Sequence, residues 1–319
     1  MYYFIAENGV RMKRLIYYAF IMIVVVLIIP LFIVKSCTAG LDDKPVQEAP
    51  QSVVTLELKP EEIAVYNAES KTVHSMDLEE YVKCVVAAEM PAEFEIEALK
   101  AQAVAARTYA FTRMLNSYDG RDDLHQGADV CTDPGHCQAW VSKETAMSHW
   151  EEEKAEVYWG KIERAVEETR GIIITYEDTV ANPVFHSNSG GRTENAENVW
   201  RGSPVPYLVS VDSEGEDMCD EYENVVSIKK EDFIEALKRK YPSFKFSGAD
   251  IIDDMEITGY TEGGRVKDIR IGNITLSGTE FRNLYSLKSA NFKIENGENG
   301  TLKITTTGNG HGEGMSQWG

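Results

Sequence analysis

Two adjacent segments with helical spacing, separated by a proline, constrain the fold of this chain more than any other feature. The first segment carries an apolar stripe of helical period, made of Leu78, Val82, Val85 and Val86. Glu89 continues this stripe toward the core. Because Pro91 disfavours helical geometry in the residue before it, the helix should end by Met90.

The second segment is rich in alanine and predicts a helix over about residues 95–115. Small side chains allow the two helices to approach closely, and Arg107 falls on the packed side of the second one. Asp77 is the expected N-cap of the first helix. The pattern therefore predicts a closely packed helical pair with a carboxylate, Glu89, at one end.

This placement of Glu89 predicts unusual chemistry. The last turn of a helix carries partial negative charge on its carbonyls, and the apolar stripe removes water, so both effects should raise the pKa of Glu89. A glutamate that keeps its proton near neutral pH is suited to general-acid catalysis. The alternative is a structural helix-end residue paired with a base such as Arg107.

The remainder of the chain combines helices with short strands. A charged amphipathic helix is expected over residues 151–169 and a shorter one over 231–240. β-branched runs that favour strands occupy residues 172–176, 208–212, 254–257, 266–271 and 302–306. We expect an α+β fold in which a helical catalytic part packs on β-rich subdomains, preceded by one transmembrane helix.

The transmembrane helix is expected at residues 15–34, which carry no charge and are long enough to cross a bilayer. Arg11, Lys13 and Arg14 precede the segment, so the N-terminus should face the cytoplasm. The sequence thus predicts a single-pass protein of the cell membrane with its catalytic region outside. A cleaved signal peptide is the alternative.

The predicted organisation has four parts. They are a cytoplasmic tail at 1–14, the anchor at 15–34, a linker at 35–55 and an extracytoplasmic catalytic region at 56–319. A β-rich subdomain is possible within the last part, at about residues 220–305. The formal net charge of −20 excludes binding to nucleic acid through its phosphates.

A dense group of cysteine and histidine residues lies within a loop-like stretch. It consists of His125, Cys131, His136 and Cys137. Two thiolates and two imidazoles form a complete tetrahedral ligand set for zinc, and such a closed site would be structural because it leaves no position for substrate. A disulfide between Cys131 and Cys137 and free side chains are the alternatives.

Several blocks in the same order resemble the stage II sporulation protein D family of cell-wall lytic transglycosylases. The blocks cover residues 85–91, 98–110, 165–171, 185–193, 206–208, 276–282 and 310–319. The resemblance implies cleavage of peptidoglycan glycan strands between N-acetylmuramic acid and N-acetylglucosamine, giving 1,6-anhydromuramyl ends. It also implies septal wall remodelling and engulfment during endospore formation, together with stage II sporulation proteins P and M.

The resemblance makes Glu89 the catalytic residue and points to residues that bind the glycan. Lys100 and Arg107 lie in a family block, and a salt bridge is the alternative role for each. His186 and Ser189 are expected in a tight turn lining the cleft rather than as a nucleophile, and Tyr207 belongs to the next block.

His311 lies among alternating glycines, which should let a ligand or another backbone approach closely; a flexible tail is the alternative.

Two other functions compete with glycan cleavage for the chain as a whole. One is a zinc-dependent wall amidase or peptidase with the Cys/His group as its catalytic site. The other is a non-catalytic wall-binding scaffold, in which Glu89 would have no role in cleavage.

Overall fold

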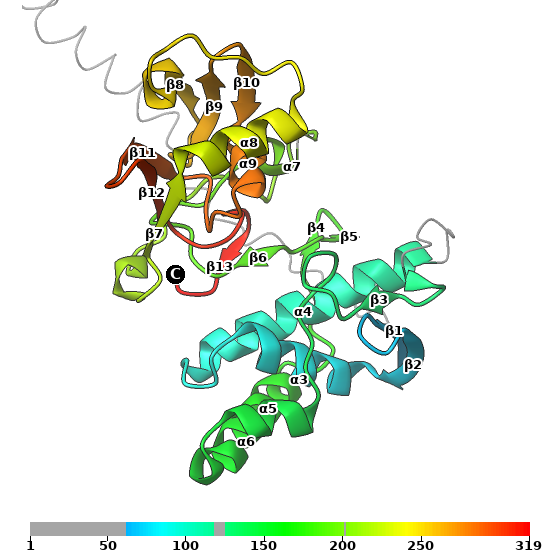
Figure 1. Ribbon diagram of the computed structural model, residues 1–319. Coiled ribbons are helices and arrows are strands. Elements are labelled where there is room, and N and C mark those ends of the chain that lie inside the picture. Colours follow the sequence, from blue (N-terminus) through cyan, green and yellow to red (C-terminus); the bar gives the residue numbers. More distant parts are fainter. Residues whose placement is uncertain (1–61, 118–124, 201) are drawn as a thin grey trace, which may run out of the picture. The chain divides into compact units, whose positions relative to one another are not determined.

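The computed structural model describes residues 62–117, 125–200 and 202–319 (Figure 1). The predicted tail, membrane anchor and linker all fall outside the described residues. Contacts divide the chain into residues 1–57 and 58–319, and every described residue belongs to the second unit. Within the described part, no helix has both the length and the apolar character needed to cross a membrane.

The two helices predicted on either side of Pro91 are present. Helix α3 spans Leu78–Glu89, and its N-cap Asp77 accepts hydrogen bonds from the first free backbone N–H groups of the helix. It ends one residue before Met90, whose backbone is extended. Helix α4 spans Ile96–Ser117, close to the predicted bounds.

Helix α6 (Glu152–Glu168) packs beside α3 and α4 around one hydrophobic core, and helix α5 (Lys143–His149) packs against α3 and α6 through a smaller cluster of Cys84, Ala146 and Trp159 (Figure 1). Fully buried side chains from three of the helices meet in the larger core: Val82, Val85, Leu99, Ala103, Ala106, Ile162 and Val166. Helix α6 was predicted, whereas the short α5 was not. Ser142 caps α5 by accepting a hydrogen bond from the Thr145 N–H.

A small sheet completes the helical part. Its strands are β1 (Glu62–Asn67), β2 (Thr72–Asp77) and β3 (Val130–Cys131), in the order β2-β1-β3. Strand β2 is antiparallel to β1 and leads directly into α3, while β3 is parallel to β1. Ile63, Val65 and Val130 of this sheet join the core of the helices.

A buried ion pair joins the helices of this core. The Arg107 guanidinium of α4 is 1% exposed and binds the Glu79 carboxylate of α3 through both Nε and Nη2, at 2.9 and 2.6 Å. The same guanidinium donates to the carbonyl oxygens of Val166 in α6 and Ile172 beyond it. One side chain therefore links α3, α4 and the end of α6.

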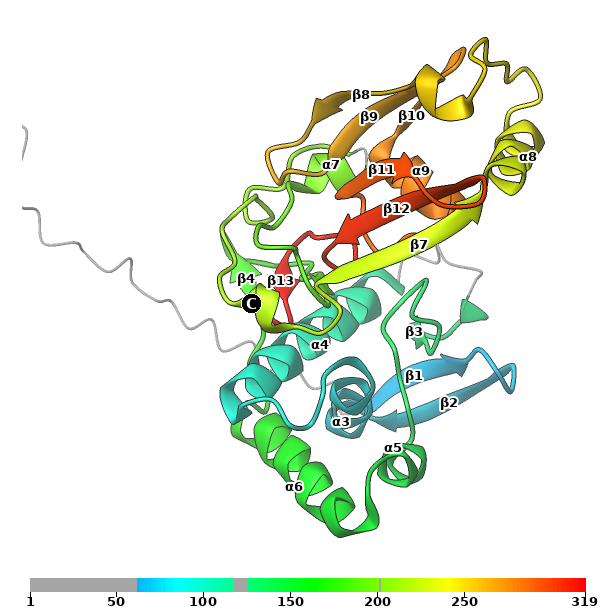
Figure 2. The same ribbon diagram turned by 60° about the vertical axis from the view of Figure 1, so that its left-hand side comes forward.

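A second core lies among the strands between residues 223 and 307 (Figure 2). One sheet has the order β11-β12-β7, with bounds Phe292–Asn296, Thr301–Thr307 and Glu223–Lys229. The other has the order β10-β9-β8, with bounds Ile274–Ser277, Val266–Ile271 and Met255–Tyr260. Both sheets are antiparallel throughout.

Helices α8 (Lys230–Lys240) and α9 (Gly278–Leu284) complete this second core. Three buried aromatic rings meet here, with centroids 4.3–6.0 Å apart: Phe233 of α8, Phe281 of α9 and Tyr285, which caps α9. Phe233 and Tyr285 are stacked, and the other two pairs are tilted. The fold is therefore a mixed α+β fold, as expected, with separate helical and strand-rich cores.

Short elements lie between the two cores along the chain. They are β4 (Thr175–Tyr176), β5 (Thr179–Val180), β6 (Phe185–His186), α7 (Ala196–Trp200) and a 3-10 helix at Glu216–Met218. A second 3-10 helix, Ile251–Asp254, belongs to the strand-rich core. The last strand, β13 (Met315–Ser316), pairs in parallel with β6. This pairing brings the Gly-rich segment near the end of the sequence to residues 185–186.

The strand predicted over residues 208–212 is wrong, and that over 172–176 is reduced to β4. Side chains bind the backbone groups that a β-ladder would use in the first segment. The Thr193 hydroxyl donates to the Val209 carbonyl oxygen and accepts from the Val211 N–H, while the Asn195 side chain accepts from the Ser210 N–H. These side-chain hydrogen bonds from residues 193 and 195 take the place of a continuous β-ladder.

The Arg107–Glu79 pair gives a first prediction. We expect Arg107→Ala to lower the free energy of unfolding by about 3–5 kcal/mol, because it leaves a buried carboxylate without its partner. Urea denaturation followed by circular dichroism measures the loss. The double variant Arg107→Met with Glu79→Leu should be more stable than Arg107→Ala, because no charge is left buried. An Arg107→Ala protein as stable as wild type would contradict the prediction.

Candidate active site and metal cluster

Glu89 is the last residue of α3 and is half-buried. Ala139 donates its backbone N–H to Glu89 Oε1 at 2.6 Å, and the Gln317 side chain also hydrogen-bonds to this carboxyl group. The acid therefore lies where three segments far apart in the sequence meet: the end of α3, the loop before α5 and the segment after β13.

Burial raises the pKa of Glu89, as the apolar stripe predicted. The hydrogen bonds from Ala139 and Gln317 favour the ionised form and act in the opposite direction, but burial is the larger effect. Glu89 thus keeps its proton to a higher pH than an exposed glutamate while remaining partly accessible. These are the properties of a general acid.

The partners of Glu89 were not predicted from the sequence. Gln317 is anchored on both sides, since its side-chain Nε2 donates to Gln102 Oε1 of α4 at 3.2 Å and its backbone N–H donates to the His186 carbonyl oxygen at 2.9 Å. Gln317 lies within a block of the resemblance, which marked the segment but not this contact. No sequence pattern relates positions more than 200 residues apart.

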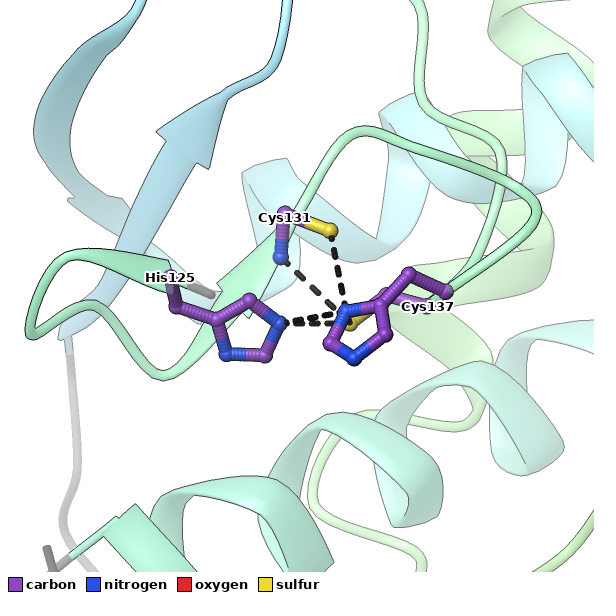
Figure 3. Close-up of side chains that lie close together, drawn as sticks. His125, Cys131 and Cys137 are labelled. Atoms are coloured by element: carbon purple, nitrogen blue, oxygen red, sulfur yellow. Dashed lines mark hydrogen bonds between the residues drawn. The ribbon is translucent and has the colours of Figure 1, made fainter. Parts of the chain in front are cut away.

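His125, Cys131, His136 and Cys137 come together as one compact group. Figure 3 labels three of them, His125, Cys131 and Cys137. The four ligand atoms lie within 4.8 Å of one another. His125 Nε2 is 2.9 Å from His136 Nδ1 and 3.3 Å from Cys137 Sγ, and Cys131 Sγ is 3.5 Å from His136 Nδ1. Both cysteines are free thiols in the structure.

These separations are close to those of a metal-ligand set. A tetrahedral zinc ion at ordinary bond lengths holds nitrogen and sulfur ligands about 3.3–3.8 Å apart. The group contains two nitrogens and two sulfurs, of which His125 and Cys131 are buried. The cluster can therefore hold a metal ion, with the donor types that zinc prefers.

The cluster is connected to the acid through a short piece of chain. Cys137 is two residues from Ala139, whose N–H donates to Glu89. Between them, Gln138 is buried and donates to the Tyr81 hydroxyl of α3 and the Ala106 carbonyl of α4. The conformation of the metal-ligand loop therefore determines the position of Ala139, whose N–H donates to Glu89.

Two of the residues predicted to bind substrate, Lys100 and Tyr207, line one pocket with a volume of about 670 Å³. Its walls are mostly apolar and include Val104, Val184 and Met315. The Tyr207 ring lies 5.1 Å from that of Tyr176, and its hydroxyl accepts a hydrogen bond from the Asn182 N–H. Glu89 does not line this pocket.

The salt-bridge alternatives describe the two basic residues well. Lys100 lies 2.9 Å from Glu97 and 2.7 Å from Glu168, and its hydrogen bonds to Glu168 and then Glu97 raise its pKa. Arg107 is buried against Glu79, not Glu89. The Arg107 guanidinium therefore binds its partners inside the helical core. Of these two basic residues, Lys100 is the one that lines the pocket.

His186, Ser189 and His311 belong to a buried polar network between β6, β13 and the strand-rich core. The rings of His186 and His311 lie 5.4 Å apart, and burial lowers their pKa values to about 3 and about 4. Ser189 donates to the Glu216 carboxylate at 2.7 Å. The Ser189 hydroxyl is therefore used in a buried hydrogen bond to Glu216. It has no histidine partner that would activate it as a nucleophile among the hydrogen bonds of the described residues.

The alternating glycines near His311 let other groups approach the backbone, as expected. A Cβ atom on Gly312, where φ is +87°, would lie 1.9 Å from the Arg265 guanidinium. One on Gly314, where φ is +73°, would lie 2.1 Å from the Val184 carbonyl oxygen. The segment is therefore a packed part of the structure, and the groups that approach it belong to the protein.

Glu313 is a second unusual acid, which no sequence pattern indicated. It is 1% exposed, and its Oε2 atom has no hydrogen-bond partner. Burial raises its pKa to about 7, Glu197 and Glu194 add to this, and a hydrogen bond to Trp200 opposes it. Unlike Glu89, it is closed off from solvent.

The fold and the site define a mixed α+β protein with a half-buried carboxylic acid beside a Cys/His metal-ligand set. A family model described as stage II sporulation protein matches residues 66–176. The chain is 37% identical to stage II sporulation protein D of Bacillus subtilis (strain 168), over 90% of this chain and 79% of that protein.

It is 36% identical to stage II sporulation protein D of Bacillus amyloliquefaciens, over 86% of this chain and 76% of that protein. It is also 26% identical to a protein of B. subtilis named amidase enhancer, over 75% of this chain and 36% of that protein. The chain belongs to the stage II sporulation protein D family and is a sporulation protein of that family.

The pKa of Glu313 gives a prediction about stability. Between pH 4.5 and about pH 7 the folded state keeps a proton that the unfolded state has released, so wild-type stability falls as the pH rises through this window. Glu313→Gln removes the effect, and its stability relative to wild type should increase from pH 4.5 to pH 7 and then level off.

Urea denaturation of both proteins at several pH values measures this difference. Glu214→Gln, at an exposed position, is the matched control and should show no such trend. A constant difference between Glu313→Gln and wild type across the window would contradict the raised pKa.

Proposed function

We propose that this chain is a lytic transglycosylase that cleaves peptidoglycan glycan strands between N-acetylmuramic acid and N-acetylglucosamine. The observation that supports this most directly is Glu89, a half-buried acid with a raised pKa held by Ala139 and Gln317. Such an acid keeps its proton to a higher pH than an exposed glutamate and can protonate a leaving oxygen. The reaction itself is the one that the family resemblance implies.

In the proposed reaction, Glu89 gives its proton to the bridging oxygen as the bond from that oxygen to muramyl C1 breaks. The muramyl C6 hydroxyl attacks C1 and returns its proton to Glu89, which closes a 1,6-anhydro ring. One enzyme carboxyl is sufficient, because the substrate supplies the nucleophile from within the same sugar. Glu89 ends the cycle protonated, as it began.

Lys100 and Tyr207 are proposed as substrate-binding residues through the pocket that they share. Each of His186, Ser189 and His311 is already hydrogen-bonded inside the protein. Their proposed role is therefore indirect: they hold the Gly-rich segment in the conformation that the substrate meets. For Arg107 the buried pair with Glu79 favours a structural role instead.

Zinc is the metal we propose for His125, Cys131, His136 and Cys137. Four protein ligands complete a tetrahedral site and leave no open position, which favours a structural ion over the catalytic ion of an amidase or peptidase. The ion would fix the loop that carries Ala139 and therefore the donor to Glu89.

A non-catalytic role is the main competitor, and the name of the relative called amidase enhancer is compatible with it. Such a scaffold would bind the wall or a partner enzyme and release no product. A half-buried acid with a raised pKa favours catalysis, because a scaffold has no use for a proton donor.

We further propose that the enzyme is held at the cell membrane by residues 15–34 with its catalytic region outside the cytoplasm. There it would remodel the septal wall during engulfment, together with stage II sporulation proteins P and M. This setting follows from the sequence pattern and the family resemblance.

The reaction predicts that Glu89→Gln releases at least about 100-fold less anhydromuramyl product, because the amide keeps the shape but cannot transfer the proton. Mass spectrometry of digested glycan strands detects the product and also distinguishes cut peptides from no cleavage. Glu95→Gln, at an exposed position beyond Pro91, is the control and should retain activity. Near wild-type product release by Glu89→Gln would refute the assignment.

The metal assignment predicts about one equivalent of zinc per purified chain, measured by elemental analysis. Cys131→Ser should lose most of the zinc and unfold at a lower temperature, whereas Cys219→Ser, which changes a cysteine outside the cluster, should retain it. Absence of metal combined with a Cys131–Cys137 crosslink in peptide mapping would favour the disulfide instead.

A further inference from the structure

We infer that Trp318, supported by Phe94, forms the surface on which one sugar ring of the glycan rests beside Glu89. The two aromatic rings meet edge to face, with centroids 4.8 Å apart and planes inclined by 79°. Trp318 is 37% exposed, so part of this residue is open to solvent while its ring contacts Phe94. This inference rests on the proposed glycan-cleaving function.

Both rings come from segments that border the acid. Phe94 lies in the turn that follows α3, where its N–H donates to the Pro91 carbonyl oxygen at 3.1 Å, five residues after Glu89. Trp318 directly follows Gln317, whose side chain bonds to Glu89. Adjacent Cα atoms are about 3.8 Å apart, so Trp318 is one residue from a direct partner of the acid.

The segment that carries Trp318 is held in place by hydrogen bonds within the protein. Its backbone N–H donates to the Ser187 carbonyl oxygen at 3.2 Å, and the strand before it pairs with β6. The neighbouring Gln317 is anchored to Gln102. An aromatic ring held in this way loses little conformational entropy when a ligand covers it, which favours binding.

The surrounding chemistry suits a neutral sugar with amide groups. A pyranose ring offers an apolar C–H face to an aromatic ring, and its hydroxyl and acetamido groups form hydrogen bonds at the edge. Each hydrogen-bond partner of the acid has a buried glutamine beside it. Gln102 accepts a hydrogen bond from Gln317 and has its Nε2 atom unpaired, and Gln138 directly precedes Ala139 and has its Oε1 atom unpaired. Buried polar atoms are nearly always paired, so these two amides mark unused hydrogen-bonding capacity beside the partners of the acid.

The experiment measures binding without turnover. Tri-N-acetylchitotriose is titrated by calorimetry into the Glu89→Gln protein and into the same protein carrying Trp318→Ala, Trp318→Phe or Tyr260→Ala. Tyr260 is an aromatic control, 61% exposed on β8. We expect Trp318→Ala to weaken binding about tenfold, Trp318→Phe to recover most of the loss and Tyr260→Ala to bind as the parent does.

With the acid restored, Trp318→Ala should raise KM for glycan strands more than it lowers kcat, because a binding surface acts mainly on the bound substrate. Unchanged affinity in Trp318→Ala, or no binding of the trisaccharide by the Glu89→Gln parent, overturns this inference. Neither result affects the product analysis that tests the proposed function, so the two failures are distinguishable. Circular dichroism of each variant verifies folding, and the conservative Trp318→Phe provides the measurement if the alanine variant is unstable.

Discussion

The position of the candidate acid depends on the buried pair between Arg107 and Glu79. Glu79 lies in the first turn of α3 and Glu89 in its last, so about 15 Å of continuous helix separates them. The guanidinium fixes the first turn against α4 and the end of α6. Apolar packing could allow small sliding of the helices, but a bidentate ion pair permits one register. The carboxyl of Glu89 is therefore placed by an interaction at the opposite end of its helix.

The parts of this arrangement that could be predicted are those set by residues close together in the sequence. Asp77 and Pro91 mark the ends of α3 because a cap and a proline act on neighbouring residues, and both ends are as predicted. The strand expected at residues 208–212 failed because Thr193 and Asn195, which are distant in sequence, bind its backbone groups. The partner of Arg107 was missed for a related reason, since Glu79 has the appearance of an ordinary acidic residue at a helix start.

The site shows the same division between local and distant information. The raised pKa of Glu89 followed from its own helix, and the four members of the metal-ligand cluster followed from thirteen consecutive residues that form one loop. Ala139 and Gln317 could not be predicted, because their contact with Glu89 depends on how loops and strands meet in three dimensions. Residue patterns identify the donors of a site more readily than they identify what holds those donors in place.

Comparison of the two perturbed acids shows why burial alone does not identify a catalytic group. Glu313 has the more complete burial and a pKa raised to about 7, yet it is enclosed by protein and can only exchange its proton when the structure opens. Glu89 is half-buried, so a substrate oxygen can approach it while the apolar wall still favours the protonated form. A proton donor needs both a raised pKa and access for the group it protonates. In the described part of the chain, Glu89 combines these two properties, with an open aromatic ring at Trp318 nearby to hold a sugar.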